Sequence, residues 1–285
     1  MSLELCILAS GSSGNCTILR SPQGIVLIDI GIGPRTTAKR MAGTGVTVAQ
    51  VAAICLTHLD GDHFRPTWLN TIAKQAIRVF CHTRRVQDLL RMVIDHDARR
   101  EIEKLLCPFD GVPFEALAGV RFHPIRLPHD QAGSHGFRIE GFGCRIGYAT
   151  DLGRVPDALV EHFTDVDILA MESNYDPEME LGSRRPQFLK KRIMGGHGHL
   201  SNEQAMQAIA RILDRCNRNR RSLPQHVVLL HRSQECNCPK LVRRFFERDS
   251  RIANRLTLAE QHARTAWLRA AGRSGFGQQL QFTWG

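Results

Sequence analysis

The chain has 285 residues, of which 42% are hydrophobic and 23% are charged, a composition typical of a folded globular protein. Its longest apolar runs are too short to cross a bilayer, and no basic segment precedes an apolar one at the N-terminus, so we expect neither a membrane span nor a signal peptide. The net charge of +10 leaves two interpretations open, a nucleic-acid partner or merely solvated basic helix faces.

The nine cysteines are odd in number, and several lie in apolar runs, where a thiol packs as a small hydrophobic group. They predict a reducing, cytoplasmic location without disulfides. Cys236 and Cys238 are the one close pair. They lack CxxC spacing and a second ligand pair, so they do not predict a zinc site.

The first part of the chain mixes short strands with helices. Three strands separated by Gly, Ser and Asn turns are expected within residues 3–31. The next expected elements are a helix, a buried strand, a helix, a strand and one long amphipathic helix, at 34–42, 51–60, 65–76, 77–82 and 84–106.

A second strand-rich part follows, and its order predicts the fold. Strands are expected at 120–130, 135–142, 144–151, 167–173, 226–231 and 255–261, with helices near 156–163, 202–214 and 239–249 and a pairing segment at 265–270. Two such halves predict an α+β fold, a four-layer αββα sandwich with helices outside two facing sheets. We expect one domain over 1–270 and a tail without periodicity over 271–285.

The sequence "THLDGDH" at residues 57–63 follows a buried strand and concentrates metal-ligating side chains. Strand alternation places His58 and Asp60 on one side, and the turn allowed by Gly61 directs Asp62 and His63 to a second point. Such an arrangement suits two metal ions about 3.5–4 Å apart that share a bridging hydroxide.

Three further candidate ligands lie far along the chain, each at the end of a strand-like run. They are His129 in "LPHD", Asp151 in "GYATD" and His231 in "VVLLH". Four candidates within six residues and three more at strand ends predict a metal site rather than a set of capping and surface residues.

These motifs, with "SGSSGN", "IDIGI", "ESNYD", "GHLSN" and "LLHRSQECNCP", resemble the metallo-β-lactamase superfamily, and their order is similar to its YycJ/WalJ-like branch. The likeness extends to about residue 265. It implies an αββα sandwich, a dinuclear site and phosphodiester hydrolysis, with 5′-exonuclease action on DNA known in the branch.

The resemblance also implies a ligand set. One ion would take His58, Asp60 and His129, the other would take Asp62, His63 and His231, and Asp151 would bridge them. Asp60 departs from the family signature HxHxDH, because it stands where the second histidine is expected. A carboxylate ligand shifts the preference from Zn²⁺ toward Mn²⁺ or Fe²⁺, and it can also weaken the first site. The expected cofactor is therefore two divalent ions, Zn, Mn or Fe.

Further roles are expected around the metal ions. Asp62 is a candidate for orienting the nucleophile, and His199 for protonating the leaving oxygen or holding a phosphate. Asp29 is expected to support a turn or a ligand, and Glu172 to support a ligand or face the substrate. The residues expected to contact substrate are Ser12, Ser13, Asn15, Asn174, Ser201 and Asn202.

Alternatives stay open for several of these residues. "GSSGN" at 11–15 can offer amides to a phosphate, or it is only a tight turn. Ser201 or Asn202 can cap the helix that follows them. His135, His197 and His226 are interpreted as structural or surface residues.

The predicted function is metal-dependent phosphodiester hydrolysis by a nuclease acting on DNA or RNA. One alternative is hydrolysis of a small or cyclic phosphodiester. A second is a nucleic-acid-binding protein whose metal site is impaired at Asp60.

Overall fold

Two seven-stranded sheets lie face to face in the computed structural model, which describes residues 2–271. The first has the order β14-β1-β2-β3-β4-β5-β6, with β1 Glu4–Ala9, β2 Cys16–Ser21, β3 Gly24–Ile28, β4 Val51–Cys55, β5 Arg78–His82, β6 Leu106–Phe109 and β14 Leu268–Arg269. The second has the order β13-β12-β11-β10-β9-β8-β7, with β7 Phe114–Leu117, β8 Val120–Leu127, β9 Ser134–Gly141, β10 Cys144–Ala149, β11 Ile168–Glu172, β12 His226–Leu230 and β13 Leu256–Leu258.

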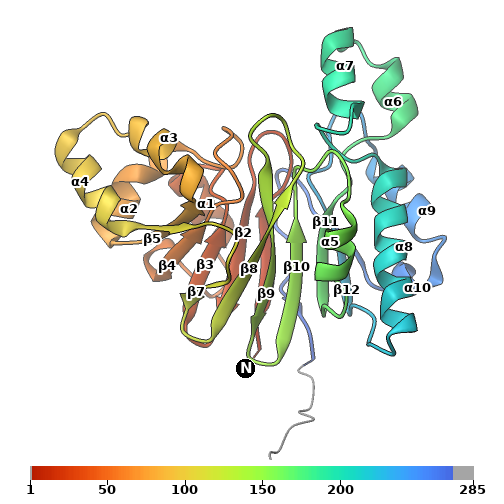
Figure 1. Cartoon of the computed structure of the whole chain (residues 1–285), viewed down its shortest axis with the longest axis horizontal. Helices are drawn as coiled ribbons and strands as arrows, with labels where there is room; N and C mark the ends of the chain where they lie inside the picture. Colours follow the sequence, from red (N-terminus) through yellow and green to blue (C-terminus); the bar gives the residue numbers. More distant parts are fainter. Residues whose placement is uncertain (1, 272–285) are drawn as a thin grey trace, which may run out of the picture.

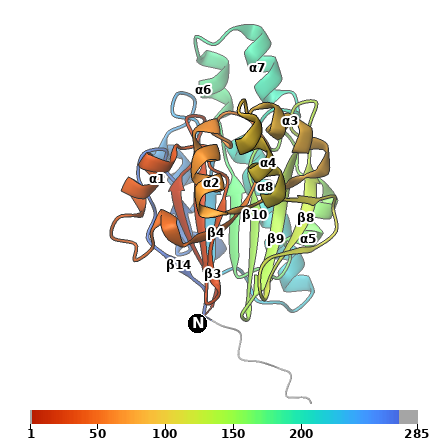
Figure 2. The ribbon, with the colours of Figure 1, turned by 90° about the vertical axis from the view of Figure 1, so that its left-hand side faces the viewer.

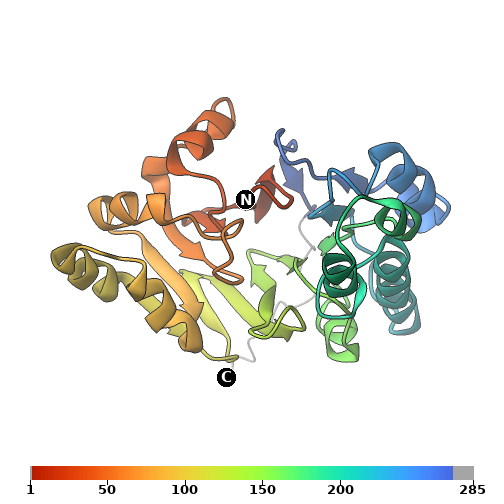
Figure 3. The same ribbon diagram turned by 90° about the horizontal axis from the view of Figure 1, so that it is seen from above.

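Helices cover the outer side of each sheet (Figures 1 and 3). The first sheet packs against α1 Pro34–Met41, α2 Leu69–Gln75, α3 Val86–Arg91 and α4 His96–Leu105. The second packs against α5 Asp157–His162, α8 Asn202–Arg218, α9 Pro239–Phe246 and α10 Ser250–Ala253. Short 3₁₀ turns are η1 Val48–Gln50, η2 Pro66–Trp68 and η3 Thr83–Arg85. Two more helices, α6 Pro177–Gly182 and α7 Gln187–Met194, rise above the sheets at one end (Figures 1 and 2).

Strand alternation divides the apolar side chains between the layers. In β1, Leu5 and Ile7 point into the core between the two sheets, whereas Cys6 and Leu8 pack under the helices of the first sheet. Consecutive side chains of a strand face opposite sides, so a strand that is apolar throughout must be covered on both sides. The αββα sandwich expected from the order of the elements is the one observed.

Strand direction decides where the site lies. β3 and β4 run parallel in the first sheet, and β10, β11 and β12 run parallel in the second. β8 and β10 are both antiparallel to β9 and therefore share one direction. The segments that follow these strands consequently meet at one rim of the sandwich.

The helix predicted over 84–106 is wrong as a single element. α3 ends at Arg91 and α4 begins at His96, because the Asp95 carboxylate accepts a hydrogen bond from the Ala98 amide and caps a new helix. The end of the predicted helix becomes β6, at the edge of the first sheet. β7, α6 and α7 are not among the predicted elements.

The end of the described chain returns to its beginning. β14 pairs antiparallel with β1, as expected for the segment 265–270. Apart from Ala271, the predicted tail at 271–285 lies outside the described residues. Within residues 2–271, no helix combines the length and apolar character that a membrane crossing requires.

Candidate metal centre

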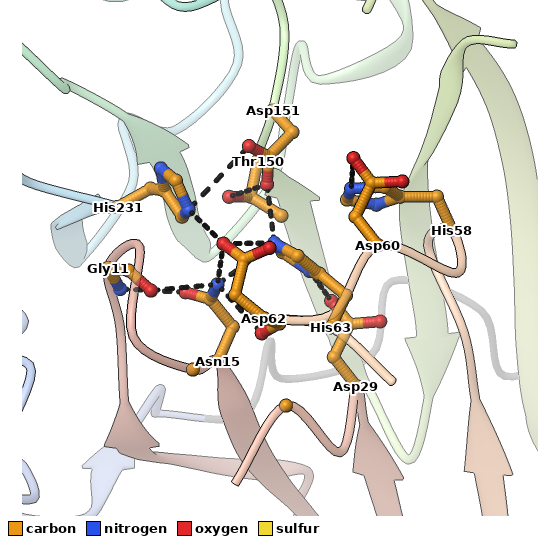
Figure 4. Close-up of polar contacts among 12 residues, drawn as sticks. Gly11, Asn15, Asp29, His58, Asp60, Asp62, His63, Thr150, Asp151 and His231 are labelled. Atoms are coloured by element: carbon orange, nitrogen blue, oxygen red, sulfur yellow. Dashed lines mark hydrogen bonds and ion pairs between the residues drawn. The ribbon is translucent and has the colours of Figure 1, made fainter. Parts of the chain in front are cut away.

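The seven predicted metal ligands converge at the rim where these strands end, and Figure 4 labels all of them except His129. The segment 57–63 follows β4, while His129, Asp151 and His231 follow β8, β10 and β12. Asp62 and His231 are 169 positions apart in sequence, and yet the Asp62 Oδ2 lies 3.2 Å from the His231 Nε2. The site is therefore a product of sheet topology rather than of one local motif.

Three acidic or histidine residues at these strand ends adopt the left-handed backbone conformation. The φ angles are 60° at Asp29, 53° at Asp151 and 53° at His231. This conformation is uncommon for residues other than glycine, and such residues cluster at functional sites. The backbone turns sharply at each of these three positions, as the chain leaves β3, β10 and β12.

The first ligand group contains His58, Asp60 and His129. The Asp60 Oδ2 lies 3.7 Å from the His58 Nε2 and 3.9 Å from the His129 Nε2. The Nδ1 of His129 is 2.9 Å from the Gly198 carbonyl oxygen and so donates to it, which leaves Nε2 to face Asp60. Asp60 thus occupies the place of a third ligand beside the two imidazoles.

The second group contains Asp62, His63 and His231, and Asp151 lies between the two groups. The His63 Nε2 is 3.6 Å from the Asp62 Oδ2 and 2.7 Å from the Asp151 Oδ2. The other Asp151 oxygen, Oδ1, is 3.6 Å from the His231 Nε2 and 3.9 Å from the His129 Nε2. Asp151 therefore contacts imidazoles of both groups, which is the placement a bridging ligand needs.

One buried carboxylate, that of Asp29, orients both histidines of the 57–63 segment. It accepts hydrogen bonds from the Thr57 amide, the Thr57 hydroxyl and the His63 Nδ1, at 2.8, 2.8 and 2.7 Å. Because the Thr57 hydroxyl gives its only hydrogen to Asp29, the His58 Nδ1, 2.9 Å away, must donate to the hydroxyl oxygen. The His58 Nε2 then carries a bare lone pair.

Gly31 allows the 57–63 segment to approach the chain that follows β3. A Cβ at this position would lie 1.6 Å from the Asp62 carbonyl oxygen, so only a glycine fits. The Asn15 amide on the adjacent turn donates to the same oxygen at 2.7 Å. The loop that bears Asp62 is thus held by main-chain contacts independent of its side chain.

The charges of the cluster oppose the effect of burial. Burial alone would raise the pKa of Asp151, but His231 and His63 bring it well below its usual range. Burial would lower the pKa of His231, but Asp151, Asp62 and Glu172 raise it to about 10. The carboxylates are consequently ionised at neutral pH and available as ligands.

His58 supplies an independent indication of a metal ion. Burial, followed by the neighbouring His63, lowers the pKa of His58 to about 3, so its imidazole is neutral. Its Nε2 is buried and has no hydrogen-bond partner among the described residues. Buried polar atoms rarely lack a partner, and a neutral imidazole nitrogen beside carboxylates is a good metal ligand. The donor set therefore fits divalent ions.

His199 and Glu172 extend the cluster. The His199 Nδ1 lies 2.8 Å from the Glu172 Oε1, and the buried Glu172 carboxylate also accepts from the Leu152 amide at 3.0 Å. His199 lines a cleft of about 470 Å³ together with Asp62 and Asp151. Its Nε2 has no hydrogen-bond partner among residues 2–271, so it is available to a ligand in that cleft.

The predicted substrate-binding residues divide into two sets. Ser12 and Asn174 line the cleft, and Asn174 also donates to the His231 carbonyl oxygen at 2.6 Å. Ser13, Asn15, Ser201 and Asn202 do not line it.

Three of these four are buried and hydrogen-bond to other parts of the chain. Asn15 donates to the Asp62 carbonyl oxygen and lies 2.9 Å from the His63 Nε2. Ser201 caps α8, and the Asn202 side chain bonds to Ser173. The motif "GHLSN" thus contributes one histidine to the cleft and a capping box to the helix.

Sequence reasoning missed the arginines of the cleft. Arg185 precedes α7 and Arg192 lies within it, and both line the cleft, although the sequence analysis counts them only as part of the net positive charge. The signal that could have revealed them is the position of this run between "ESNYD" and "GHLSN", two segments that carry site residues.

Residues 25–227, more than half of the chain, match the family model described as a beta-lactamase superfamily domain. The chain therefore belongs to this superfamily, as predicted. The match implies a divalent metal site where the histidine and aspartate side chains converge.

Two relatives specify the comparison further. Exodeoxyribonuclease YycJ from Bacillus anthracis is 24% identical over 246 residues, which cover 85% of this chain and 87% of YycJ. Exodeoxyribonuclease WalJ from Streptococcus pneumoniae is 24% identical over 235 residues, 82% of this chain and 83% of WalJ. Among solved structures, the metallo-beta-lactamase fold protein YhfI from Bacillus subtilis matches with a TM-score of 0.66 and 11% identity, covering 93% of this chain and 100% of YhfI. The predicted fold is confirmed.

Proposed function

We propose that this chain is a metal-dependent phosphodiester hydrolase that degrades DNA from an end. The observation that carries the proposal is the placement of Asp151 between two ligand groups at one cleft. Two closely spaced divalent ions are a recurring arrangement in enzymes that displace an oxygen from phosphorus. The two relatives named exodeoxyribonucleases support DNA as the substrate.

Asp62 and His199 have the proposed catalytic roles. Divalent ions, when bound, lower the pKa of a coordinated water and withdraw charge from the phosphate. The Asp62 side chain, 24% exposed, accepts a hydrogen bond from the attacking water and directs it at phosphorus. His199, held through Nδ1 by Glu172, gives a proton from Nε2 to the departing oxygen.

Basic groups favour a polyanionic substrate. Arg185 and Arg192 lie on the wall of the cleft. Arg185 is paired with Glu180 and Glu235, and Arg192 with Asp130, so a phosphate in the cleft would share these guanidinium groups with carboxylates. The net charge of +10 acts in the same direction over a longer range. We also propose a cytoplasmic location, because nine cysteines, several of them in apolar runs, are typical of a reducing compartment.

The function is tested on two substrates, long linear DNA and a small chromogenic phosphodiester, with Mn²⁺, Fe²⁺ or Zn²⁺. We expect hydrolysis of both, with the DNA rate alone falling steeply as salt is added, because salt competes with phosphate contacts. The same weak salt response for both would favour the alternative of a small phosphodiester substrate. Tight DNA binding without turnover under any of the three metals would favour the binding-protein alternative.

Asp60 determines which metal is preferred. The neighbouring His129 imidazole, 3.9 Å away, acts against burial and lowers the pKa of Asp60 to about 2, so an anionic oxygen faces the two imidazoles. We expect about two equivalents of metal per chain by elemental analysis. The Asp60→His variant should retain zinc over manganese more strongly, by about tenfold or more, because imidazole is the softer ligand. One equivalent or none in the wild-type chain, even after reconstitution, would contradict a complete first site.

A further inference from the structure

Helices α6 and α7 form a hairpin that rises above the sheets at one end (Figures 1 and 2), and the inner side of α7 borders the cleft of the metal centre. Leu189 and Ile193 line that cleft, and they belong to a small apolar cluster that also contains Tyr175 and Cys236. The hairpin is therefore part of the wall along which a substrate reaches the candidate metal centre.

Polar groups on the inner side fix the shape of the hairpin. Lys190 is buried, and its Nζ donates to the Leu181 and Ser183 carbonyl oxygens at 2.6 and 2.8 Å. Arg185 donates to the fully buried Glu180 carboxylate at 2.9 Å. Each of these bonds ties α6 to α7 or to the connection between them, so the outer face of α7 is held in place.

The outer face of α7, formed by Phe188, Lys191 and Arg192, presents an exposed aromatic ring beside cationic groups. Phe188 is 73% exposed, although Lys190 and Ile193 on the opposite side of the helix are buried. Lys191 and Arg192 follow Phe188 at the i+3 and i+4 positions, which share one face of a helix, and both are exposed. A single exposed apolar residue is ordinary on a protein surface, and what distinguishes Phe188 is the charge around it.

The charge near Phe188 is positive and only partly compensated. Residues 181–194 contain no aspartate or glutamate, and their basic residues are Arg184, Arg185, Lys190, Lys191 and Arg192. Arg185 and Arg192 are paired with carboxylates, and Lys190 is turned inward. Arg184 and Lys191 are exposed and form no ion pair with any residue in the range 2–271. Two cationic side chains therefore remain for an anionic ligand.

We propose that the outer face of α7 is a platform for single-stranded DNA, on which Phe188 stacks against an unpaired base while Lys191 and Arg184 hold adjoining phosphates. This proposal rests on the proposed function, because the strand passes from the platform into the cleft at Arg192, one helical turn from Phe188.

The chemistry of the platform favours a single strand over other occupants. Proteins commonly bind single strands with aromatic rings beside cationic groups, since every base has a face that can stack and every linkage carries a charge. In a duplex the neighbouring base pairs cover the faces of each base, so Phe188 has nothing to stack on. A second copy of the chain is disfavoured, because two faces that each carry unpaired cations would repel each other.

The test measures binding of short single strands to the full chain in a chelator, so that nothing is cleaved. No residue of the platform is a candidate metal ligand. Each strand carries 2-aminopurine at one of several successive positions, and the fluorescence of this base falls when it stacks on an aromatic ring. We expect Phe188→Ala to weaken binding about tenfold or more and to abolish the fall in fluorescence, as the loss of one stacked base would. Unchanged binding and unchanged fluorescence in Phe188→Ala would overturn the proposal.

Matched variants assign the effect to the ring. Phe188→Tyr keeps an aromatic face and should bind like the wild-type chain, whereas Phe188→Leu keeps only an apolar side chain and should bind as weakly as Phe188→Ala. Lys191→Gln should keep the fluorescence change and reduce the slope of log affinity against log salt by about 0.7. Phe142→Ala is the control, because it removes an exposed phenylalanine from the β9–β10 turn, at the opposite end of β10 from Asp151, and should leave binding unchanged. Thermal unfolding verifies that each variant is folded.

Duplex DNA and the assembly state identify the occupant. A relaxed circular duplex, which has neither an end nor an unpaired base, should bind the wild-type chain and Phe188→Ala equally well. A similar loss of duplex affinity in Phe188→Ala would indicate a general backbone contact and would contradict a stacking platform. Dimers of the wild-type chain that separate in Phe188→Ala would make a second copy the occupant, and the proposal would be wrong.

The kinetics separate this proposal from the proposed function. We expect Phe188→Ala to raise the KM for single-stranded DNA about tenfold rather than to lower kcat, because the platform lies away from the reacting bond. If the wild-type chain hydrolyses nothing but loses single-strand affinity through Phe188→Ala, the platform is supported while the hydrolase proposal fails. If the chain hydrolyses DNA and Phe188→Ala keeps the wild-type KM and affinity, the platform is wrong while the proposed function stands.

Discussion

The Asp62→Ala variant is expected to fold normally and to hydrolyse DNA about a thousandfold more slowly than the wild-type chain. The loss corresponds to several kcal/mol of transition-state stabilisation, at about 1.4 kcal/mol for each factor of ten. Asp62 contributes both a ligand oxygen, 3.2 Å from the His231 Nε2, and the proposed orientation of the attacking water. Its main-chain oxygen is held by Asn15, so the loop does not depend on its side chain.

Hydrolysis rates, metal content and thermal unfolding are measured on the same preparations. Asp97→Ala is the control, because it removes an aspartate whose side chain is 82% exposed on α4, and it should leave all three unchanged. Intact turnover in Asp62→Ala would exclude the proposed mechanism. Lost turnover with full metal content would assign Asp62 mainly to orientation of the water.

The Asp29→Ala variant is expected to lose roughly 3–5 kcal/mol of unfolding free energy. The change leaves the Thr57 amide, the Thr57 hydroxyl and the His63 Nδ1 without their acceptor in a fully buried place. It also places alanine at a φ of 60°, which costs about 1–2 kcal/mol. This cost is part of the roughly 3–5 kcal/mol of unfolding free energy given above. The midpoint of thermal unfolding should fall by on the order of 10 °C.

Metal retention should fall together with stability in Asp29→Ala, because Asp29 sets the ring orientation of His63 directly and that of His58 through Thr57. Asp95→Ala is a matched control, which removes one capping bond of α4 at an exposed position and should cost only about 1 kcal/mol. A midpoint and metal content in Asp29→Ala equal to those of Asp95→Ala would show that the buried carboxylate does not hold the site together.

The convergence of the predicted metal ligands at one place could be anticipated because these residues have strong local signals. His58 to His63 follow a buried strand, and alternation together with the Gly61 turn assigns them to two groups, which are the groups the structure brings together. His129, Asp151 and His231 are each recognisable at the end of an apolar run. The sequence also predicts the layers, since strands such as β1 are apolar at successive positions and must be covered on both faces.

Supporting residues could not be assigned in the same way. Asn15 resembles a phosphate-binding residue in a glycine-rich turn, and yet its amide faces the Asp62 carbonyl oxygen from an adjacent strand connection. The break in the helix over 84–106 depends on which of several aspartates becomes a cap. The role of Asn15 depends on a contact between distant segments. The helix break depends on competition between local conformations. Residue type alone predicts neither.

The sequence by itself determined the class of fold and singled out the histidine and aspartate side chains that converge at one rim, because strand period and side-chain chemistry act over a few residues. Only the tertiary structure decided that Asp29 orients two histidines and that His199 pairs with Glu172. Each of these depends on which strand ends become neighbours. Sheet order and direction decide that, and neither is written in any single stretch of the chain.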